Sequence, residues 1–524
     1  MTLSAPPGSL IPRPLLFWTG VALTCAGVVE HLWTFIDSAS VDFRMSMMGM
    51  SSVMWAAMVA IVVGVVLSGF AVVQPRTPGP GAAPIPARTT TVSRRRLIAI
   101  LSFALLVDQM KPATLAFISP GLRAEYHLSA SDVSWLPTVA LTGTVLGSLV
   151  WGRAADRIGR RATILIASLL FLGTTVCGAM PTFGGTLVTC ALMGMAAGGM
   201  LPVVYALMTE SLPPGRRAAI MVLQAGLTTT GGYMAASGLA AVLIPLAGWR
   251  VTWFAQLPLV LILIALNRWI PESAAFTARR ARTKQVPASA LFARPQTAKT
   301  LVVSAYALAW GLVYWGFITL LPSQLESAGR HGMSAATLLF FSSLLAIPTC
   351  AIGAWLYMRW SAKGTMVVYA ALTVAALLTL AAVGMDGSRP VLLATVMLLF
   401  VGTAGVIALI GPYTAEIYPV AIRGTAGGWA AAIGKSGGAF GPPLITLALA
   451  APGGVRTAAV FVAFPMALAG LAVAVRGSTP QAVAQSPEGA APLVAEPDDL
   501  AGSEAVSGWT TATARLPGEG GTAT

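Results

Sequence analysis

The sequence contains few charged residues. Asp, Glu, Lys and Arg make up only 10% of its 524 residues, whereas hydrophobic residues make up 56%. Typical soluble domains carry about 25% charged residues, which keep their surfaces in water. The mean hydropathy of +0.79 points the same way. These values exclude an ordinary soluble protein and predict a protein that crosses the membrane many times.

Cysteine and histidine are also scarce. The four cysteines, Cys25, Cys177, Cys190 and Cys350, fall at irregular spacings inside apolar runs. This pattern indicates neither a disulfide framework nor a zinc site. No nucleophile stands with a suitable base either, so we expect a protein that is not an enzyme and that holds no cofactor or metal. Four methionines within residues 45–50 could bind Cu(I), but we interpret them as adaptable packing residues.

Acidic residues are scarcer than basic ones, 18 against 32, which gives a net charge of +14. No patch combines basic and aromatic residues, so we expect no nucleic-acid partner. In a membrane protein, a basic excess marks the loops that stay in the cytoplasm, and roughly 24 of the Lys and Arg residues fall on the side of both termini, against about six on the other. We therefore expect a multi-pass protein of the cell inner (plasma) membrane with both termini cytoplasmic.

Long apolar runs are abundant. A helix that crosses the hydrocarbon core needs about 20 apolar residues. Fourteen segments meet this requirement: 14–36, 48–73, 97–119, 134–151, 162–180, 185–209, 218–245, 251–270, 300–324, 335–358, 365–384, 390–413, 425–449 and 456–475. The first resembles a signal peptide, but its apolar run continues to Phe35, which favours a membrane span.

Stretches rich in Pro, Gly and charge divide the chain. A tail with few aromatic residues follows the last span. We expect two added transmembrane helices in 1–73, a cytoplasmic linker in 74–96, an N-terminal six-helix half in 97–270, a cytoplasmic inter-half loop in 271–299, a C-terminal six-helix half in 300–476 and a disordered cytoplasmic tail in 477–524.

An internal repeat relates the two halves. Five positions recur at a single offset: Glu210, Pro213, Arg217 and Gly231-Gly232 in the first half, and Glu416, Pro419, Arg423 and Gly437-Gly438 in the second. Six spans lie between the copies, so the repeat is parallel, as expected of a carrier that rocks one half against the other around a midplane site. The alternative is that these residues only cap helix ends, which explains the residue types but not the shared offset.

The loop between the fourth and fifth spans reads GRAADRIGRR, residues 152–161. It resembles the G-x-x-x-D-R-x-G-R-R signature of the major facilitator superfamily at every specified position. The resemblance covers about residues 97–475, through GWRVTWF, WIPES, YWGFITLLP and YTAEIYPVAIRG. It is greatest to the branch of sugar porters, synaptic-vesicle-protein-like carriers, nicotinate-type carriers and aromatic-acid/proton symporters. It implies an all-α polytopic membrane protein with a 12-helix core of two parallel six-helix repeats, plus two N-terminal transmembrane helices, 14 in total.

The resemblance also implies a gate on the cytoplasmic side. Asp156 and Arg157 of the loop would pair with charged residues of both repeats when the carrier faces outward, and separate when it faces inward. Partly buried ion pairs suit a switch, because their net stability is small while breaking one leaves a charge unpaired. The gating residues implied are Gly152, Asp156, Arg157, Gly159, Arg160, Arg161, Glu210, Arg217, Glu416 and Arg423.

The sequence departs from the family pattern in three places. Cys190 stands where sugar porters carry Arg, which argues against that route of proton coupling. The span 218–245 lacks the G-P-x-x-G-G element of antiporters, which disfavours efflux by exchange. In the second half, YMRWSAKG keeps Arg359 and Lys363 but has no Asp, so we expect an asymmetric gate.

Three ionisable residues, Asp108, Lys111 and Lys435, lie within spans. Each costs about 2.5 to 3.5 kcal/mol at a helix centre, so such residues usually line a substrate or ion path. Asp108 matches the first Asp of the D-G-x-D pattern of aromatic-acid symporters, and Lys111 replaces the second. The two share a helix face, and the structural alternative is that they only satisfy each other.

Desolvation favours a protonated carboxylate, whereas a nearby cation favours an ionised one. We therefore predict that Asp108 couples transport to protons and that Lys111 and Lys435 bind an organic anion. Polar and aromatic side chains usually line such cavities, although aromatic residues in spans also serve packing. The predicted lining residues are Gln224, Tyr314, Trp315 and Trp429.

These features predict a secondary active transporter of a small organic solute. Proton-coupled import of an organic acid or similar metabolite by alternating access is the leading hypothesis. The alternatives are a proton-driven exporter of drugs or metabolites and, in another class, a non-transporting sensor or scaffold. We expect a small-molecule substrate, protons and the lipid bilayer as partners, and a monomer.

Overall fold

The computed structural model describes residues 12–41, 43–73, 93–212, 214–272, 288–327, 334–419 and 422–479. Most of the predicted linker, inter-half loop and tail lies outside the described residues. The added helices and the first half comprise α1 (Pro14–Asp37), η1 (Ser38–Val41), η2 (Met45–Met47), α2 (Ser52–Val72), α3 (Arg94–Tyr126), α4 (Ala130–Ile158), α5 (Arg160–Gly173), η3 (Thr174–Ala179), α6 (Phe183–Ser211), α7 (Pro214–Ala247), α8 (Val251–Phe254), α9 (Leu257–Leu266) and η4 (Asn267–Trp269).

The second half follows a short helix, η5 (Ala288–Phe292). Its first span combines α11 (Thr297–Gly311), the π-helical η6 (Leu312–Ile318) and α12 (Thr319–Ser327). The remaining helices are α13 (Ala335–Arg359), α14 (Ala362–Val383), α15 (Arg389–Ile417), α16 (Arg423–Ala450) and α17 (Val455–Arg476).

Thirteen of the described stretches are long and apolar enough to cross a membrane. The fourteenth span is α16, which is less apolar because it contains many glycines, two prolines and Lys435. The chain is therefore a multi-pass membrane protein. The predicted total of fourteen transmembrane helices is confirmed, with ends that differ from the predicted ones by a few residues.

Short polar residues begin several helices. Ser93 accepts a hydrogen bond from the backbone of Arg96 at the start of α3, and Ser129 and Asp132 form a capping box at the start of α4. These contacts satisfy N–H groups that have no partner within the helix. Between α4 and α5, Gly159 adopts a φ of +96°, which glycine reaches without strain.

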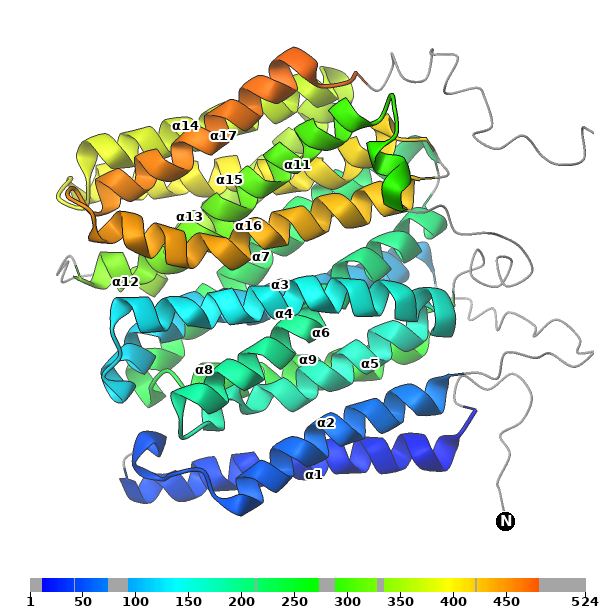
Figure 1. Ribbon diagram of the computed structural model, residues 1–524, viewed down its shortest axis with the longest axis vertical. Helices are drawn as coiled ribbons and strands as arrows, with labels where there is room; N and C mark the ends of the chain where they lie inside the picture. The colour runs from blue at the N-terminus through cyan, green and yellow to red at the C-terminus, as the bar shows by residue number, and fades with distance from the viewer. Residues whose placement is uncertain are drawn as a thin grey trace, which may run out of the picture. The chain divides into compact units, whose positions relative to one another are not determined.

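Two of the helix crossings between the halves are related to each other. α4 packs against α16, and α7 packs against α13. Figure 1 shows the helices of the second half, α11 to α17, grouped above those of the first half. Counted within the halves, each crossing joins the second helix of one to the fifth helix of the other. Two parallel repeats related by a two-fold axis are expected to pair their second and fifth helices in this reciprocal way. The fold is therefore the predicted 12-helix core with two helices added.

The added helices α1 and α2 form a hairpin that packs on α5 (Figure 1). The two cross at Gly20 and Gly64, where a Cβ on either glycine would collide with the backbone of the other helix. Small residues at a crossing allow this close approach in membranes. As a result of this cover, every residue in the most apolar window of Arg160–Ala179 is buried.

The connection between α1 and α2 ties the hairpin to the core. Met45 is fully buried in a cluster with Met54 and Ala179, next to Phe254. The neighbouring backbone N–H of Ser46 donates to Glu125 Oε1 of α3 at 3.2 Å. Met45 thus serves packing, in agreement with the interpretation of the sequence.

Candidate functional site

A lysine bridges the two halves near the middle of the bundle. We call the end at which α1 begins and α17 ends the terminal end, and the opposite end the far end (Figure 1). Lys435 of α16 donates to Ser148 Oγ of α4 at 3.3 Å and to the carbonyl of Gly198 of α6 at 3.5 Å. Both contacts are long for hydrogen bonds, so the ammonium is weakly held at the boundary between the halves.

On the terminal side of this contact, two glycines have room beside them. Gly152 lies one turn from Ser148 along α4, and Gly428 lies two turns from Lys435 along α16, so both face the same boundary. A Cβ built on either glycine would meet no heavy atom of the described residues within 4 Å. Among the described residues, the boundary therefore has room on the terminal side of Lys435.

The far side of the same boundary is closed. Leu141 lies two turns from Ser148 in the other direction, and its side chain would stand 2.9 Å from a Cβ placed on Gly438 of α16. In addition, α12 of the second half packs against α3 of the first. Lys435 thus lies between glycines that have room beside them on the terminal side and closely packed side chains on the far side.

Asp108 of α3 is almost completely buried, with 2% of its surface exposed. Its Oδ2 accepts a hydrogen bond from Gln109 Nε2 at 3.0 Å, while Oδ1 has no hydrogen-bond partner among the described residues. Lys435 of the other half and the hydroxyl of Tyr205 lie close enough to Asp108 to interact with its charge. A buried carboxylate oxygen without a partner is costly unless a ligand or proton uses it.

Lys111 turns away from this arrangement. Its Nζ donates to the carbonyl of Phe171 at 2.8 Å and lies 5.3 Å from the centre of the Phe171 ring. That carbonyl belongs to the last turn of α5, where the chain changes to the 3₁₀ helix η3 and leaves carbonyls without helical partners. In the described part of the chain, no ion pair joins Lys111 to Asp108. Its role as an anion ligand stays a prediction.

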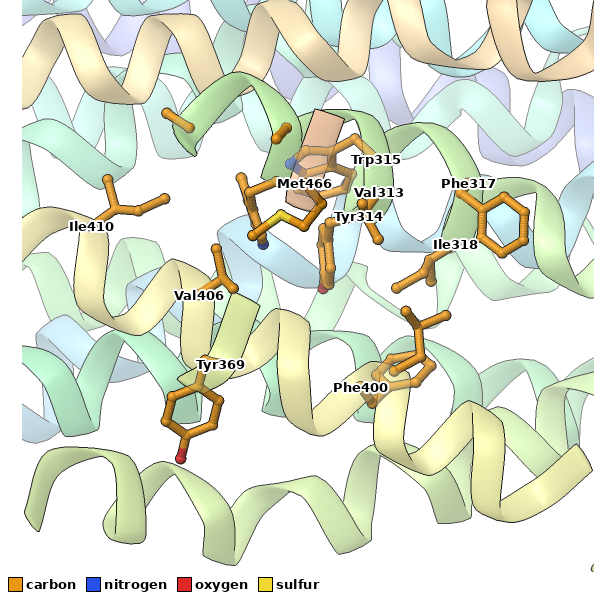
Figure 2. Close-up of a cluster of buried hydrophobic side chains, with 14 of the residues drawn as sticks. Val313, Tyr314, Trp315, Phe317, Ile318, Tyr369, Phe400, Val406, Ile410 and Met466 are labelled. Carbon is orange, nitrogen blue, oxygen red and sulfur yellow. The ribbon is translucent and has the colours of Figure 1, made fainter. Parts of the chain in front are cut away.

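Aromatic rings fill the far side of the boundary. Tyr314 and Trp315 project from η6 and lie in one buried cluster with Phe400 of α15 (Figure 2). Sequence reasoning missed Tyr233 of α7, whose ring stands edge-on to Tyr314 and Phe400 with centroid distances of 6.3 and 4.9 Å. Its buried hydroxyl has no partner among the described residues. The adjacent Gly231-Gly232 of the repeat is the signal that could have found it.

The two remaining predicted lining residues, Gln224 and Trp429, differ in their hydrogen bonding. Gln224 of α7 donates to Ser102 Oγ at 3.3 Å, and its Oε1 is buried without a partner in the described residues. Trp429 of α16 donates to Ser304 Oγ at 2.8 Å, and its ring is edge-on to Phe292. Gln224 therefore keeps an unused acceptor, whereas Trp429 is anchored within the second half.

Comparison with known proteins identifies the family. A model of the Major Facilitator Superfamily matches residues 97–442, which is more than half of the chain. The chain belongs to the major facilitator superfamily. It is therefore a secondary transporter and not an enzyme.

Relatives of this superfamily member are named transporters. The niacin transporter NiaP of Acinetobacter baylyi is 25% identical over 411 residues, which cover 72% of this chain and 92% of the relative. The gentisate transporter of Corynebacterium glutamicum is 30% identical over 407 residues, which cover 73% and 88%. Among solved structures, a D-xylose-proton symporter has a similar fold, with 16% identity, a TM-score of 0.61 and coverage of 74% of this chain and 98% of that one.

The superfamily loop between α4 and α5 is partly described. Arg157 is exposed and makes no hydrogen bond or ion pair with a described residue. The backbone N–H of Arg160 donates to Glu272 Oε1 at 2.8 Å, and Arg161 Nη2 donates to the carbonyl of Arg268 at 3.3 Å. The loop is thus fixed to the end of the first half, while Arg157 projects from it.

In the second half of the transporter, Glu416 of α15 accepts a hydrogen bond from the hydroxyl of Tyr357 of α13 at 2.6 Å. Among the described residues, Arg157 makes no hydrogen bond or ion pair with Glu416, and their pairing stays a prediction. Four predicted gating side chains lie outside the described residues: Asp156, Glu210, Arg217 and Arg423.

Proposed function

We propose that this transporter imports an aromatic carboxylate together with a proton. The observation that carries the proposal is the placement of a buried carboxyl, Asp108, and a partly buried ammonium, Lys435, which come from different halves and lie close enough to interact. Ionisable residues near the middle of a membrane span usually belong to a substrate or ion path. The niacin and gentisate relatives support the substrate class, because both named solutes are carboxylic acids on an aromatic ring.

Lys435 is the proposed carboxylate ligand. Its contacts with Ser148 and Gly198 are long, so the ammonium exchanges them for a substrate carboxylate at little cost. Once the substrate neutralises Lys435, the charge that favours an ionised Asp108 is gone. Binding of an anion to Lys435 therefore favours protonation of Asp108, and protonation of Asp108 favours anion binding. Both the anion and the proton cross the membrane when the halves rock. Gln224 and the aromatic residues Tyr314 and Trp315 are proposed to line the path.

The proposed gate closes the terminal end. Arg157 is exposed and unpaired among the described residues, so it is ready to meet an acidic partner when the halves approach. We propose that Asp156 and Arg157 then pair with charged residues of both repeats, namely Glu210, Arg217, Glu416 and Arg423. Such pairs form and break without a large net change in stability.

The proposed orientation places both termini in the cytoplasm of a monomer in the plasma membrane. The excess of Lys and Arg on the terminal side supports it. In this orientation the terminal end opens to the cytoplasm, and the structure corresponds to the inward-facing state.

The variant Asp108→Asn tests the coupling. The amide keeps the shape of the side chain but cannot carry a proton. We expect uptake of nicotinate and gentisate against a gradient to be lost, while counterflow exchange continues, because exchange needs no net proton movement. The measurement is transport in proteoliposomes with and without an imposed pH gradient.

Three results would contradict the proposal. Undiminished accumulation by Asp108→Asn would remove Asp108 from coupling. Substrate movement outward in exchange for entering protons would favour the exporter. An absence of counterflow with any carboxylate by the unmodified protein would favour the sensor or scaffold.

A further inference from the structure

The third helix of the first half changes its geometry within the membrane. α5 ends at Gly173, and the chain continues directly as the 3₁₀ helix η3 from Thr174. Hydrogen bonds in a 3₁₀ helix have poorer geometry than those in an α-helix. Here side chains supply further donors, because the carbonyl of Phe171 accepts from Lys111 Nζ at 2.8 Å and from Thr174 Oγ1 at 3.1 Å. We call this place the α5–η3 junction.

The α1–α2 hairpin covers the junction on the side away from Lys111. A Cβ placed on Gly173 would collide with Cγ2 of Ile61 in α2 and would meet Cγ2 of Thr24 in α1 at 3.9 Å. Phe171, two residues earlier, faces nearly the opposite way, and the centre of its ring lies 5.3 Å from Lys111 Nζ. The junction is therefore enclosed between Lys111 and both helices of the hairpin.

The parallel repeat provides a comparison within the same molecule. α14 is the third helix of the second half and is therefore the counterpart of α5. It runs as an uninterrupted α-helix over Ala362–Val383 and packs against α13, α15 and α17 of its own half. Of the residues in its most apolar window, 39% are buried, whereas all of those in the window of Arg160–Ala179 are buried. The copy that changes its helical geometry is thus the copy that the hairpin covers.

We propose that the α1–α2 hairpin is an intramolecular partner that seals the α5–η3 junction, where Lys111 binds, from the lipid. Lipid tails cannot hydrogen-bond to backbone groups, so irregular backbone persists at membrane depth only where protein covers it. Gly173 lets the hairpin approach closely enough to exclude lipid, as small residues do between membrane helices. The inference concerns the added helices and does not depend on the proposed substrate, proton or gate.

The test follows the backbone of η3 by hydrogen–deuterium exchange and mass spectrometry. The full-length protein is measured in nanodiscs without substrate, and exchange in residues 174–179 is compared with exchange in α14. Gly173→Ala overlaps with Ile61 and pushes the hairpin away, whereas Ile61→Ala leaves a gap over the junction. We expect each single variant to speed exchange in η3 about tenfold, because local opening becomes easier there, while exchange in α14 stays within about twofold of the parent.

Combining the two substitutions should restore the seal. With alanine at position 61, a methyl group at position 173 has the Cβ of residue 61 at 3.8 Å, which is an ordinary contact. Exchange in η3 of Gly173→Ala/Ile61→Ala should therefore return to within about threefold of the parent. Gly69→Ala is the matched control on the same interface. A Cβ there stands 3.9 Å from Ile166, in the α-helical part of α5, so exchange in η3 should not change.

Three results would overturn the proposal. They are unchanged exchange in η3 in both single variants, effects that add in the double variant, and an equal increase in η3 and α14, which would mean that the whole protein is loosened. If Gly173→Ala does not fold, Ile61→Ala must still speed exchange in η3 while Gly69→Ala must not. Because the assay requires no transport, failure of carboxylate import leaves its outcome untouched.

Discussion

Lys435 makes polar contact from the second half with Ser148 and Gly198 of the first half. Lys111, which has the same charge and a similar depth in its span, instead donates to the carbonyl of Phe171 within the first half. The difference follows from helix rotation, because Lys111 faces α5 whereas Lys435 faces α4 and α6. Of the two lysines, Lys435 is the one placed for a solute that enters between the halves.

Replacing Lys435 therefore has a defined consequence. We expect Lys435→Gln to raise the KM for nicotinate about tenfold or more, because the substrate carboxylate loses a charge-assisted hydrogen bond. Lys435→Arg keeps the charge and should retain most of the affinity. The measurement is initial uptake rate against concentration, with Lys111→Gln in parallel. An unchanged KM in Lys435→Gln would exclude this lysine as the ligand.

At the scale of elements, the two glycines of the α4–α5 motif meet different demands. Gly159 has a φ of +96°, and a Cβ there would collide with the carboxylate of Glu272, whose Oε1 accepts from the first N–H of α5. Gly152 is helical and has open space beside it. The turn that joins the two spans thus requires Gly159, whereas Gly152 leaves room at the boundary between the halves.

Alanine substitutions should separate these demands. Gly159→Ala is expected to destabilise the protein by about 1–3 kcal/mol, because alanine is strained at this φ and displaces Glu272. Gly152→Ala should be neutral or stabilising by up to about 1 kcal/mol, since alanine favours the helix. Thermal unfolding of the two purified variants provides the comparison. Equal losses of stability in both variants would show that the turn does not require glycine at position 159.

At the scale of the whole molecule, most steps of the proposed transport cycle take place at the boundary between the two halves. Among the described residues, it has room on the terminal side at Gly152 and Gly428 and is closely packed on the far side at Leu141 and Gly438, with Lys435 between. The paired crossings of α4 with α16 and of α7 with α13 allow the halves to rock about this level. The α1–α2 hairpin packs on α5 of the first half, so we expect it to move with that half.

The sidedness of this opening can be measured. Gly428→Cys in the Cys25→Ser background should react with a membrane-impermeant maleimide rapidly in inside-out vesicles and slowly in right-side-out vesicles, because the terminal end is proposed to be cytoplasmic. Ser388→Cys, in the exposed connection at the far end, should show the reverse. Faster labelling of Gly428→Cys from the outside would refute the proposed orientation.

The sequence by itself determined the membrane class, the fourteen spans and the parallel repeat. The cost of placing a residue in lipid and the length of a spanning helix are properties of about 20 consecutive residues, so they can be read locally. It also singled out Asp108, Lys111 and Lys435 as costly charges, but helix spacing placed only Lys111 on the same helix face as Asp108. Only the tertiary structure decided that Lys435 of the other half lies close to Asp108, that Lys111 donates to Phe171, and that Tyr357 donates to Glu416. These facts depend on how packed helices are rotated about their axes, and contacts between residues far apart in the chain fix that rotation.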